Sequence, residues 1–137
     1  MPRSFSTTVS PYLRSLLRIM AAFDFIQHGT QKLFGFPGSR QPMPFHLFTL
    51  FGTAGILETF GGLLLLFGLF TRPVAFLLSG EMAFAYFLMH AKAGFWPILN
   101  HGELPILFCF TWLYFSVAGP GPISLDALLA SRKGSHA

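Results

Sequence analysis

The chain has 137 residues, of which 53% are hydrophobic and 17% are aromatic, while only 10% carry a charged side chain. Soluble domains contain about 25% charged residues, so the composition excludes an ordinary water-soluble domain and indicates a membrane protein. The formal charge of +4 comes from nine Lys and Arg residues against five Asp and Glu residues. Because these charges are scattered between apolar runs, they favour a role in membrane topology over a nucleic-acid partner.

Four apolar segments follow one another along the chain, and each has about the length that crosses a bilayer, roughly 20 residues. They cover residues 11–34, 45–70, 73–91 and 103–118, after ten polar residues that we expect to be mobile. Gly- and Pro-rich stretches lie between them, and residues 124–130 predict a short helix on the membrane surface. The sequence therefore predicts a single all-α domain over residues 1–137, folded as a transmembrane four-helix bundle in contact with the lipid bilayer.

Four spans place both termini on the same side of the membrane. The basic residues on that side are Arg3, Arg14, Arg18, Arg72, Arg132 and Lys133, and those on the other side are Lys32, Arg40 and Lys92. Basic residues concentrate on the cytoplasmic side of membrane proteins. We therefore expect both termini in the cytoplasm and the protein in a bacterial-type inner or plasma membrane.

This topology gathers the polar residues into two layers. The layer near the outer face contains His28, Lys32, His46, His90, Lys92, His101 and Glu103. A rise of 1.5 Å per residue puts Asp24, Glu58 and Glu81 roughly 15, 18 and 15 Å below the outer ends of their spans. Because a lone charge at the bilayer centre costs at least about 2.5 kcal/mol, we expect these three carboxyl groups to face the bundle interior. There they would share a proton with one another or pair with Arg18 or His28.

Two local patterns favour a polar pocket that opens toward the outer face. Asp24 and His28 are spaced i, i+4, which places them on one face of a helix. Glu58 stands between Gly55 and the Gly61–Gly62 pair, whose small size lets a neighbouring helix come close. Two interpretations are open for these polar residues: a binding or proton-handling site, or a buried structural pair that holds the helices in register.

Cysteine usage and motif content limit the chemistry further. The single cysteine, Cys109, lies within an apolar run, which excludes a disulfide within the chain and a CxxC redox pair. The sequence contains no phosphate loop, dinucleotide fingerprint, nucleophile elbow or HExxH zinc motif. Since the histidines lack the tight spacing of metal ligands, we predict no metal site.

Several short motifs occur in order along the chain. They are Phe25-x-x-His28-Gly29-x-x-Lys32-Leu33-Phe34-Gly35, Glu58-x-x-Gly61-Gly62, Gly68-Leu69-x-Thr71-Arg72, Met82 with His90, Gly94-Phe95, Gly102-Glu103, and Gly119-Pro120-Gly121-x-x-Ser124-Leu125-Asp126. Together they resemble the DoxX family of small four-span membrane proteins over roughly residues 18–126. One departure is His101, where the family commonly has a Gly before Gly-Glu. The resemblance implies a four-helix integral membrane protein and, as in some members, a small subunit of a sulfur-linked quinone oxidoreductase or a partner in a membrane redox-stress complex.

We interpret the chain as a redox-associated small subunit of a membrane oxidoreductase complex that binds a quinone-like molecule. Quinone reduction takes up protons together with electrons, so it requires protonatable groups beside the ring. The candidate catalytic residues are Asp24, Glu58 and His28, and the candidate cofactor-binding residues are His28, Glu58, Glu81, His90 and Glu103. The electrons would come from a partner subunit, and the question whether the chain is itself an enzyme stays open.

Two alternatives remain open at this point. A non-catalytic scaffold or assembly subunit would need the buried charges for folding only. A small transporter would use the same midplane carboxyl groups, and because four spans are few for one pathway it would require a homo-oligomer.

Overall fold

The computed structural model describes residues 5–38 and 48–134, and every regular element in these residues is a helix. The prediction of an all-α fold is therefore confirmed. Arg3, Arg40 and His46 lie outside the described residues, as do residues 45–47 at the start of the second predicted span.

The first helix, α1 (Phe5–Phe34), has 30 residues. It begins within the stretch expected to be mobile, so that expectation is wrong for residues 5–10. Pro11, which lacks a backbone N–H, lies inside the helix rather than in its first turn. The buried residues of α1 recur every three or four positions, which gives the helix one face toward the bundle. They are Ser15, Arg18, Ala22, Phe25, Gly29 and Leu33.

The second rod consists of α2 (Leu50–Ile56), a π-helical turn (Leu57–Gly61) and α3 (Gly62–Phe67). Thr49 caps its start, because its Oγ1 accepts a hydrogen bond of 3.1 Å from the N–H of Gly52. Gly68 ends it at φ +67°, a left-handed conformation that glycine adopts at low cost.

The remaining helices form a third and a fourth rod and a C-terminal extension. The third rod is α4 (Thr71–Ala85), continued by a π-helical turn (Tyr86–His90) and a 3-10 turn (Ala91–Ala93). The short α5 (Pro97–Asn100) leads to α6 (Glu103–Ala118), which is the fourth rod, and α7 (Leu125–Gly134) follows a loop over residues 119–124.

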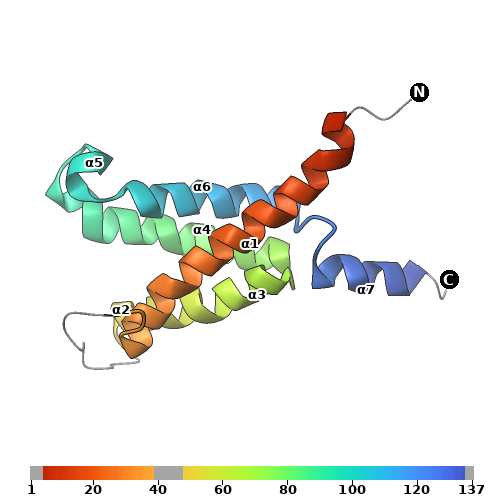
Figure 1. Cartoon of the computed structure of the whole chain (residues 1–137). Helices are drawn as coiled ribbons and strands as arrows, with labels where there is room; N and C mark the ends of the chain where they lie inside the picture. Colours follow the sequence, from red (N-terminus) through yellow and green to blue (C-terminus); the bar gives the residue numbers. More distant parts are fainter. Residues whose placement is uncertain (1–4, 39–47, 135–137) are drawn as a thin grey trace.

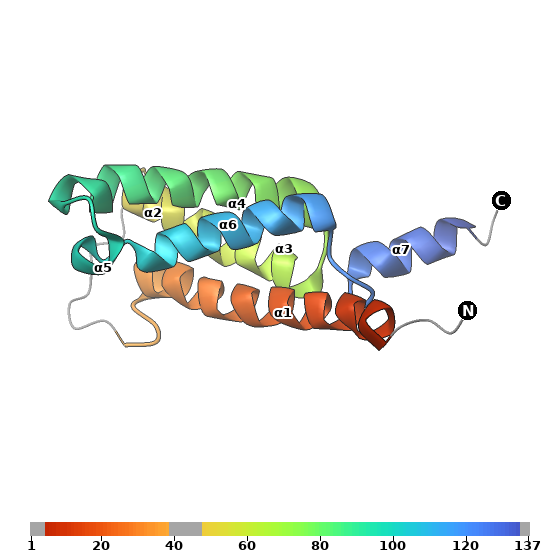
Figure 2. The ribbon, with the colours of Figure 1, turned by 90° about the horizontal axis from the view of Figure 1, so that it is seen from above.

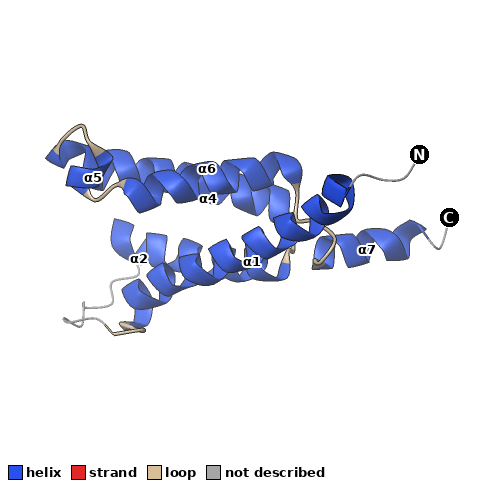
Figure 3. Ribbon diagram, turned by 45° about the horizontal axis from the view of Figure 1, so that its top comes forward, coloured by secondary structure: helices blue, strands red, loops and turns tan. Residues whose placement is uncertain are grey.

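The four rods pack against one another, with α4 and α6 side by side and α1 running obliquely across them (Figures 1 and 2). Figure 3 shows them as two pairs, α4 with α6 and α1 with the rod that begins at α2. The helix α7 lies beyond the bundle, at the end where α1 begins (Figure 1). We call this end the terminal end, and the opposite end, where α5 lies, the α5 end.

The distribution of apolar side chains is that of a protein surrounded by lipid. The core is small and aromatic, and its buried members include Phe25, Phe108, Trp112 and Phe115. Many large apolar side chains point outward instead, among them Phe76 and Phe84, whose exposed fractions are 68% and 70%. Two helical stretches, residues 50–67 and 71–93, are long and apolar enough to cross a membrane, and most of their residues are not buried within the protein. A soluble protein would hide such surface.

Arg18 holds the terminal end of the bundle together. Its buried guanidinium donates to the carbonyls of Leu65 and Leu66 at the end of α3 and to those of Pro120 and Ile123 in the 119–124 loop. The last carbonyls of a helix have no partner within that helix, and the planar fork of an arginine can satisfy several at once. Arg18 therefore ties α1 both to α3 and to the chain's C-terminal loop.

Asp126 caps α4 from a distant part of the sequence. Its two carboxylate oxygens accept hydrogen bonds of 2.9 Å from the N–H groups of Phe70 and Thr71, at the start of α4. A carboxylate at this position satisfies the free N–H groups of a helix N-terminus and matches its positive dipole. The 119–126 segment is thus part of the bundle rather than a loose tail.

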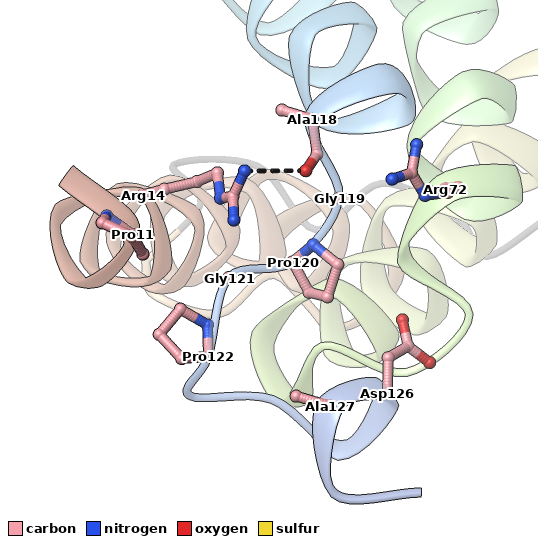
Figure 4. A pocket seen from close by; sticks show the side chains of 10 residues that line it. All are labelled: Pro11, Arg14, Arg72, Ala118, Gly119, Pro120, Gly121, Pro122, Asp126 and Ala127. Carbon is pink, nitrogen blue, oxygen red and sulfur yellow. Dashed lines mark hydrogen bonds between the residues drawn. The ribbon is translucent and has the colours of Figure 1, made fainter. Parts of the chain in front are cut away.

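Two further arginines flank the end of α6. Arg14 donates to the carbonyl of Ala118 at 2.9 Å, and Arg72 donates to those of Val117 and Ser116. Figure 4 shows both guanidinium groups beside the chain as it leaves α6, around an open hollow of about 470 Å³. These arginines satisfy the free carbonyls at the C-terminus of α6.

Candidate functional site

A buried ion pair joins α1 to the second rod. The Lys32 ammonium donates to Oε1 of Glu58, and the exposed fractions of the two side chains are 22% and 3%. Glu58 lies on the π-helical turn, an irregularity that is frequent at functional sites. The pair therefore places two opposite charges between α1 and the second rod.

Glycines bring the two helices close enough for this pair to form. A Cβ on Gly29 would lie 2.4 Å from Oγ1 and 2.5 Å from the backbone N of Thr59, and one on Gly55 would lie 3.1 Å from Cβ of Lys32. No larger residue fits at Gly29 without moving the backbone of the second rod. The expected close approach of a helix beside Glu58 is confirmed, and it explains how Lys32 reaches inward to the carboxylate.

Glu81 of α4 completes a cluster on three rods. It lies near enough to Glu58 and Lys32 for their charges to interact. Both of its carboxyl oxygens are buried and have no hydrogen-bond partner among the described residues, and Oε2 of Glu58 is in the same condition. We call Lys32, Glu58 and Glu81 the midspan cluster. Three of its four carboxyl oxygens are thus buried without a donor, which is a costly arrangement.

His28 lies beside the midspan cluster, one helical turn before Lys32. Its charge would interact with that of Glu58, and its ring meets the ring of Phe108 edge to face, with 6.0 Å between centroids. The indole N–H of Trp112, which stacks on Phe108, also has no partner among the described residues. Protonatable groups and aromatic rings therefore share the middle of the bundle.

Asp24 is not part of this arrangement. It is exposed on the outside of α1, so the expectation that it faces the bundle interior is wrong. The reason is helical geometry: α1 buries Ala22, Phe25 and Gly29, and Asp24 is turned about 100° from Phe25 around the helix axis. Its spacing to His28 puts both on one side of α1, but only His28 is near enough to the buried face to be partly covered.

Two other candidate residues lie apart from the cluster, toward the α5 end. Nδ1 of His90 is 2.9 Å from the carbonyl oxygen of Asn100, within the turn that leads to α6. Glu103 is exposed in the first turn of α6, where a carboxylate suits the helix dipole. Their contacts are those of loop and helix-end residues.

Arg18 does not pair with the carboxyl groups at midspan, so this expectation is also wrong. Its guanidinium donates to four backbone carbonyls at the terminal end. Among the described residues, the carboxylate whose charge acts on it is that of Asp126. The partner that sequence reasoning missed is Lys32, which was placed in the outer layer. Two features of the sequence indicate that Lys32 lies near this site. It is spaced four residues after His28, and it follows Gly29 by one helical turn.

The midspan cluster can hold and transfer protons. A carboxyl group without hydrogen-bond donors is a natural proton carrier, and intramembrane ionisable residues commonly mark proton or ligand pathways. The neighbouring Lys32 and His28 provide a cation and a second titratable group.

Comparison with known proteins places the chain in a family. It matches the DoxX family over residues 13–91. It is 42% identical over 127 residues to an uncharacterized protein of Haemophilus influenzae, covering 85% of this chain and 90% of that protein. It is 32% identical over 124 residues to inner membrane protein YqjF of Escherichia coli, covering 84% and 90%. A Bacillus subtilis protein named "Putative oxidoreductase CatD" is 27% identical over 128 residues, covering 86% and 87%.

No solved structure matches the chain. The family match, over residues 13–91, covers more than half of the chain. Together with the outward-facing apolar side chains of the helices, these findings support one conclusion: this chain is a membrane protein of the DoxX family.

Proposed function

We propose that this protein is a small, redox-associated subunit of a membrane oxidoreductase complex, and that its midspan cluster exchanges protons with a bound quinone-like molecule. The observation that carries the proposal is the buried carboxyl group of Glu81, whose two oxygens have no partner among the described residues. A buried polar group without a partner costs about 1–3 kcal/mol. Such a cost is explained if the group serves a reaction.

The chemistry follows from the groups that surround Glu81. Reduction of a quinone to a quinol adds two electrons and two protons to the ring oxygens. Glu81 would supply one proton from its neutral carboxyl group and the Lys32 ammonium would supply the other, and both would be restored from water. Glu58 would remain the carboxylate that holds Lys32 in place, and His28 would donate a hydrogen bond to the headgroup. The aromatic side chains of Phe108 and Trp112 provide an apolar wall against which a ring can pack.

The electrons in this proposal come from a partner subunit. The relative named as an oxidoreductase supports a redox setting, and the sequence contains no dinucleotide or thiol redox motif of its own. The chain would therefore provide the membrane part of a reaction whose reductant is bound elsewhere in the complex.

We further infer that the protein crosses a bacterial inner membrane four times, as one domain, with both termini in the cytoplasm. The start of α1 and the end of α7 lie at the same end of the bundle (Figure 1). That end also carries Arg14, Arg18 and Arg72, as the positive-inside rule requires for the cytoplasmic face. An inner membrane protein among the relatives supports the location.

One observation favours a second candidate, an assembly subunit without a redox role. Asp24 is an outward-facing carboxylate, which suits contact with another polypeptide better than contact with lipid. In this alternative the midspan cluster would only hold three helices in register, and its removal would leave the kinetics of a partner unchanged.

Ligand analysis distinguishes these candidates. We would purify the protein in native nanodiscs and identify bound small molecules by mass spectrometry, for the wild type and for Glu58→Gln, Glu81→Gln and His28→Ala. Glu103→Gln is the matched control, because it removes an exposed carboxyl group outside the cluster. We expect a quinone enriched over bulk lipid in the wild type and the control, and depleted at least tenfold in the cluster variants.

A direct titration adds a second readout. A short-chain benzoquinone should quench the fluorescence of Trp112 saturably in the wild type, with weaker binding in Glu81→Gln. Bulk lipid alone in every preparation, together with a titration that does not saturate, would reject the quinone proposal in favour of the assembly subunit.

A further inference from the structure

Asp24 is the most unusual residue on the outer surface of the bundle. It is exposed, and it makes no hydrogen bond or ion pair with any other described residue. It lies ten residues before Phe34, the end of α1, and six residues after Arg18, which is level with the end of α3. At 1.5 Å per residue these separations are roughly 15 Å and 9 Å, so Asp24 sits near the middle of the hydrocarbon layer.

Acyl chains are an unsuitable neighbour for this position. Lipid cannot donate a hydrogen bond or balance a charge, and carboxylates within membrane spans therefore face other protein groups or a water-filled cavity. Within residues 5–38 and 48–134, Asp24 is exposed and faces neither. A second polypeptide that covers this side of α1 would remove the contact with lipid.

The residues above and below Asp24 form a continuous seam. With spacings of four, three, four, three and four, the seam consists of Leu13, Leu17, Met20, Asp24, Gln27 and Gln31. This is the repeat with which two parallel helices interlock their side chains. Leu13, Leu17 and Met20 have exposed fractions of 58%, 52% and 55%, while Gln31 is exposed and Gln27 half-buried.

The polar half of the seam has free hydrogen-bonding capacity. Gln27 uses one N–H for a 3.3 Å bond to the carbonyl of Phe23, and Gln31 uses one for a 3.4 Å bond to the carbonyl of Gly38. Each amide also has a second N–H and a carbonyl oxygen that make no bond to another described residue. A glutamine amide is both donor and acceptor, so it can pair with an identical residue on another copy.

We propose that the seam is the contact between two copies of this chain, which pack α1 against α1 as a parallel, two-fold symmetric dimer within the membrane. Copies inserted with the same topology have parallel α1 helices, and a two-fold axis brings each seam residue near its own equivalent. Gln27 and Gln31 then pair across the axis. Asp24 meets Asp24 of the partner subunit, where the two carboxyl groups share a proton and accept from Gln27 of the partner subunit.

Cysteine crosslinking tests this dimer directly. Cys109→Ala removes the only native cysteine, and single cysteines are then introduced in the seam as Leu17→Cys or Met20→Cys. Phe76→Cys is the control, because it is similarly exposed and lies near the terminal end of α4 on a different rod. In native membranes treated with a mild oxidant, we expect the seam cysteines to give a dimer at least tenfold more efficiently than the control.

Variants of Asp24 show whether the polar residues hold the dimer. Since the exposed side chain makes no hydrogen bond or ion pair with another described residue, Asp24→Leu and Asp24→Asn should both fold. We expect Asp24→Leu to weaken the Met20→Cys crosslink about tenfold and Asp24→Asn to retain it, because the amide still bonds across the seam. Equal crosslinking at Phe76→Cys, monomers at every seam position, products with a different protein only, or no effect of Asp24→Leu would each overturn the proposal. None of these outcomes depends on whether a quinone binds.

Discussion

Charged side chains lie inside the bundle in two places, and they are treated differently. At the terminal end, the Arg18 guanidinium donates to four carbonyls and both oxygens of Asp126 accept backbone N–H groups. In the midspan cluster, Glu81 has no hydrogen-bond partner among the described residues and Glu58 uses one oxygen of two. The charged groups at the terminal end are thus hydrogen-bonded, whereas most carboxyl oxygens of the midspan cluster have no donor among the described residues.

The difference indicates what each region contributes. A buried charge that makes a full set of hydrogen bonds holds the helices and loops it joins in place. Removing it leaves each of its buried partners without a hydrogen bond. A buried carboxyl group without partners lowers the free energy of unfolding, so replacing it with an apolar residue of similar size is neutral or stabilising. The terminal end therefore maintains the fold, whereas the midspan cluster has to be explained by what it does.

The largest effect should come from Arg18. We expect Arg18→Met to lower the free energy of unfolding by about 3–5 kcal/mol, because it leaves buried carbonyls of α3 and of the 119–124 loop without donors. Thermal unfolding in detergent, followed by circular dichroism, measures the loss. Lys92→Gln, an exposed cation near the α5 end, is the control and should unfold like the wild type. An unchanged unfolding temperature in Arg18→Met would contradict the view that the terminal end maintains the fold.

A smaller loss is expected where α1 packs closely against the second rod, beside the midspan cluster. Gly29→Ala adds a methyl group 2.5 Å from the backbone N of Thr59, and overpacking of this kind costs about 1–3 kcal/mol. Gly80→Ala is a matched control in α4, since a Cβ there meets nothing within 4 Å, and it should be neutral or slightly stabilising. The same unfolding experiment compares the two alanines, and equal behaviour would show that the close approach at Gly29 is not needed.

The cap on α4 should contribute less again. Asp126→Ala removes both acceptors from the first N–H groups of α4, and we expect a loss of about 1–2 kcal/mol. Asp126→Asn keeps one acceptor oxygen and should fall between alanine and wild type. Hydrogen exchange of the Phe70 and Thr71 amides locates the effect, and unaltered protection in Asp126→Ala would contradict the capping role.

The smallest effect on stability, and of opposite sign, is expected in the midspan cluster. Glu81→Leu should leave the free energy of unfolding unchanged or raise it by up to about 1 kcal/mol, because a buried carboxyl group without donors is lost. The quinone content of the purified protein should nevertheless fall. Destabilisation of Glu81→Leu to the extent seen for Arg18→Met would instead make the cluster structural.

The sequence predicts the helices well, because runs of apolar residues between Gly- and Pro-rich stretches determine them almost directly. It also indicates the close packing around Glu58, since glycines beside a carboxylate have few other uses in a span. Both predictions depend on residues close together in the chain.

The sequence does not predict which way the charged residues of α1 point. Arg18, Asp24 and Lys32 lie on different sides of this helix, and their partners belong to other helices or, for Asp24, are absent from the described chain. The reach of a long lysine side chain allows Lys32 to act at a depth different from that of its own backbone. Two of the four acceptors of Arg18 come from a loop more than 100 residues further along the chain, and no local pattern connects them.

The dependence of α4 on Asp126 has a consequence for biosynthesis. The first two rods and the start of α4 leave the ribosome well before residue 126. During that interval the α4 N-terminus lacks its cap, and Arg18 lacks the acceptors at Pro120 and Ile123. Insertion of these helices into the membrane can therefore precede their final locking, which requires residues 119–126. Until then, nascent chains present an open terminal end, and this is the stage at which quality-control proteases and insertion factors would meet them.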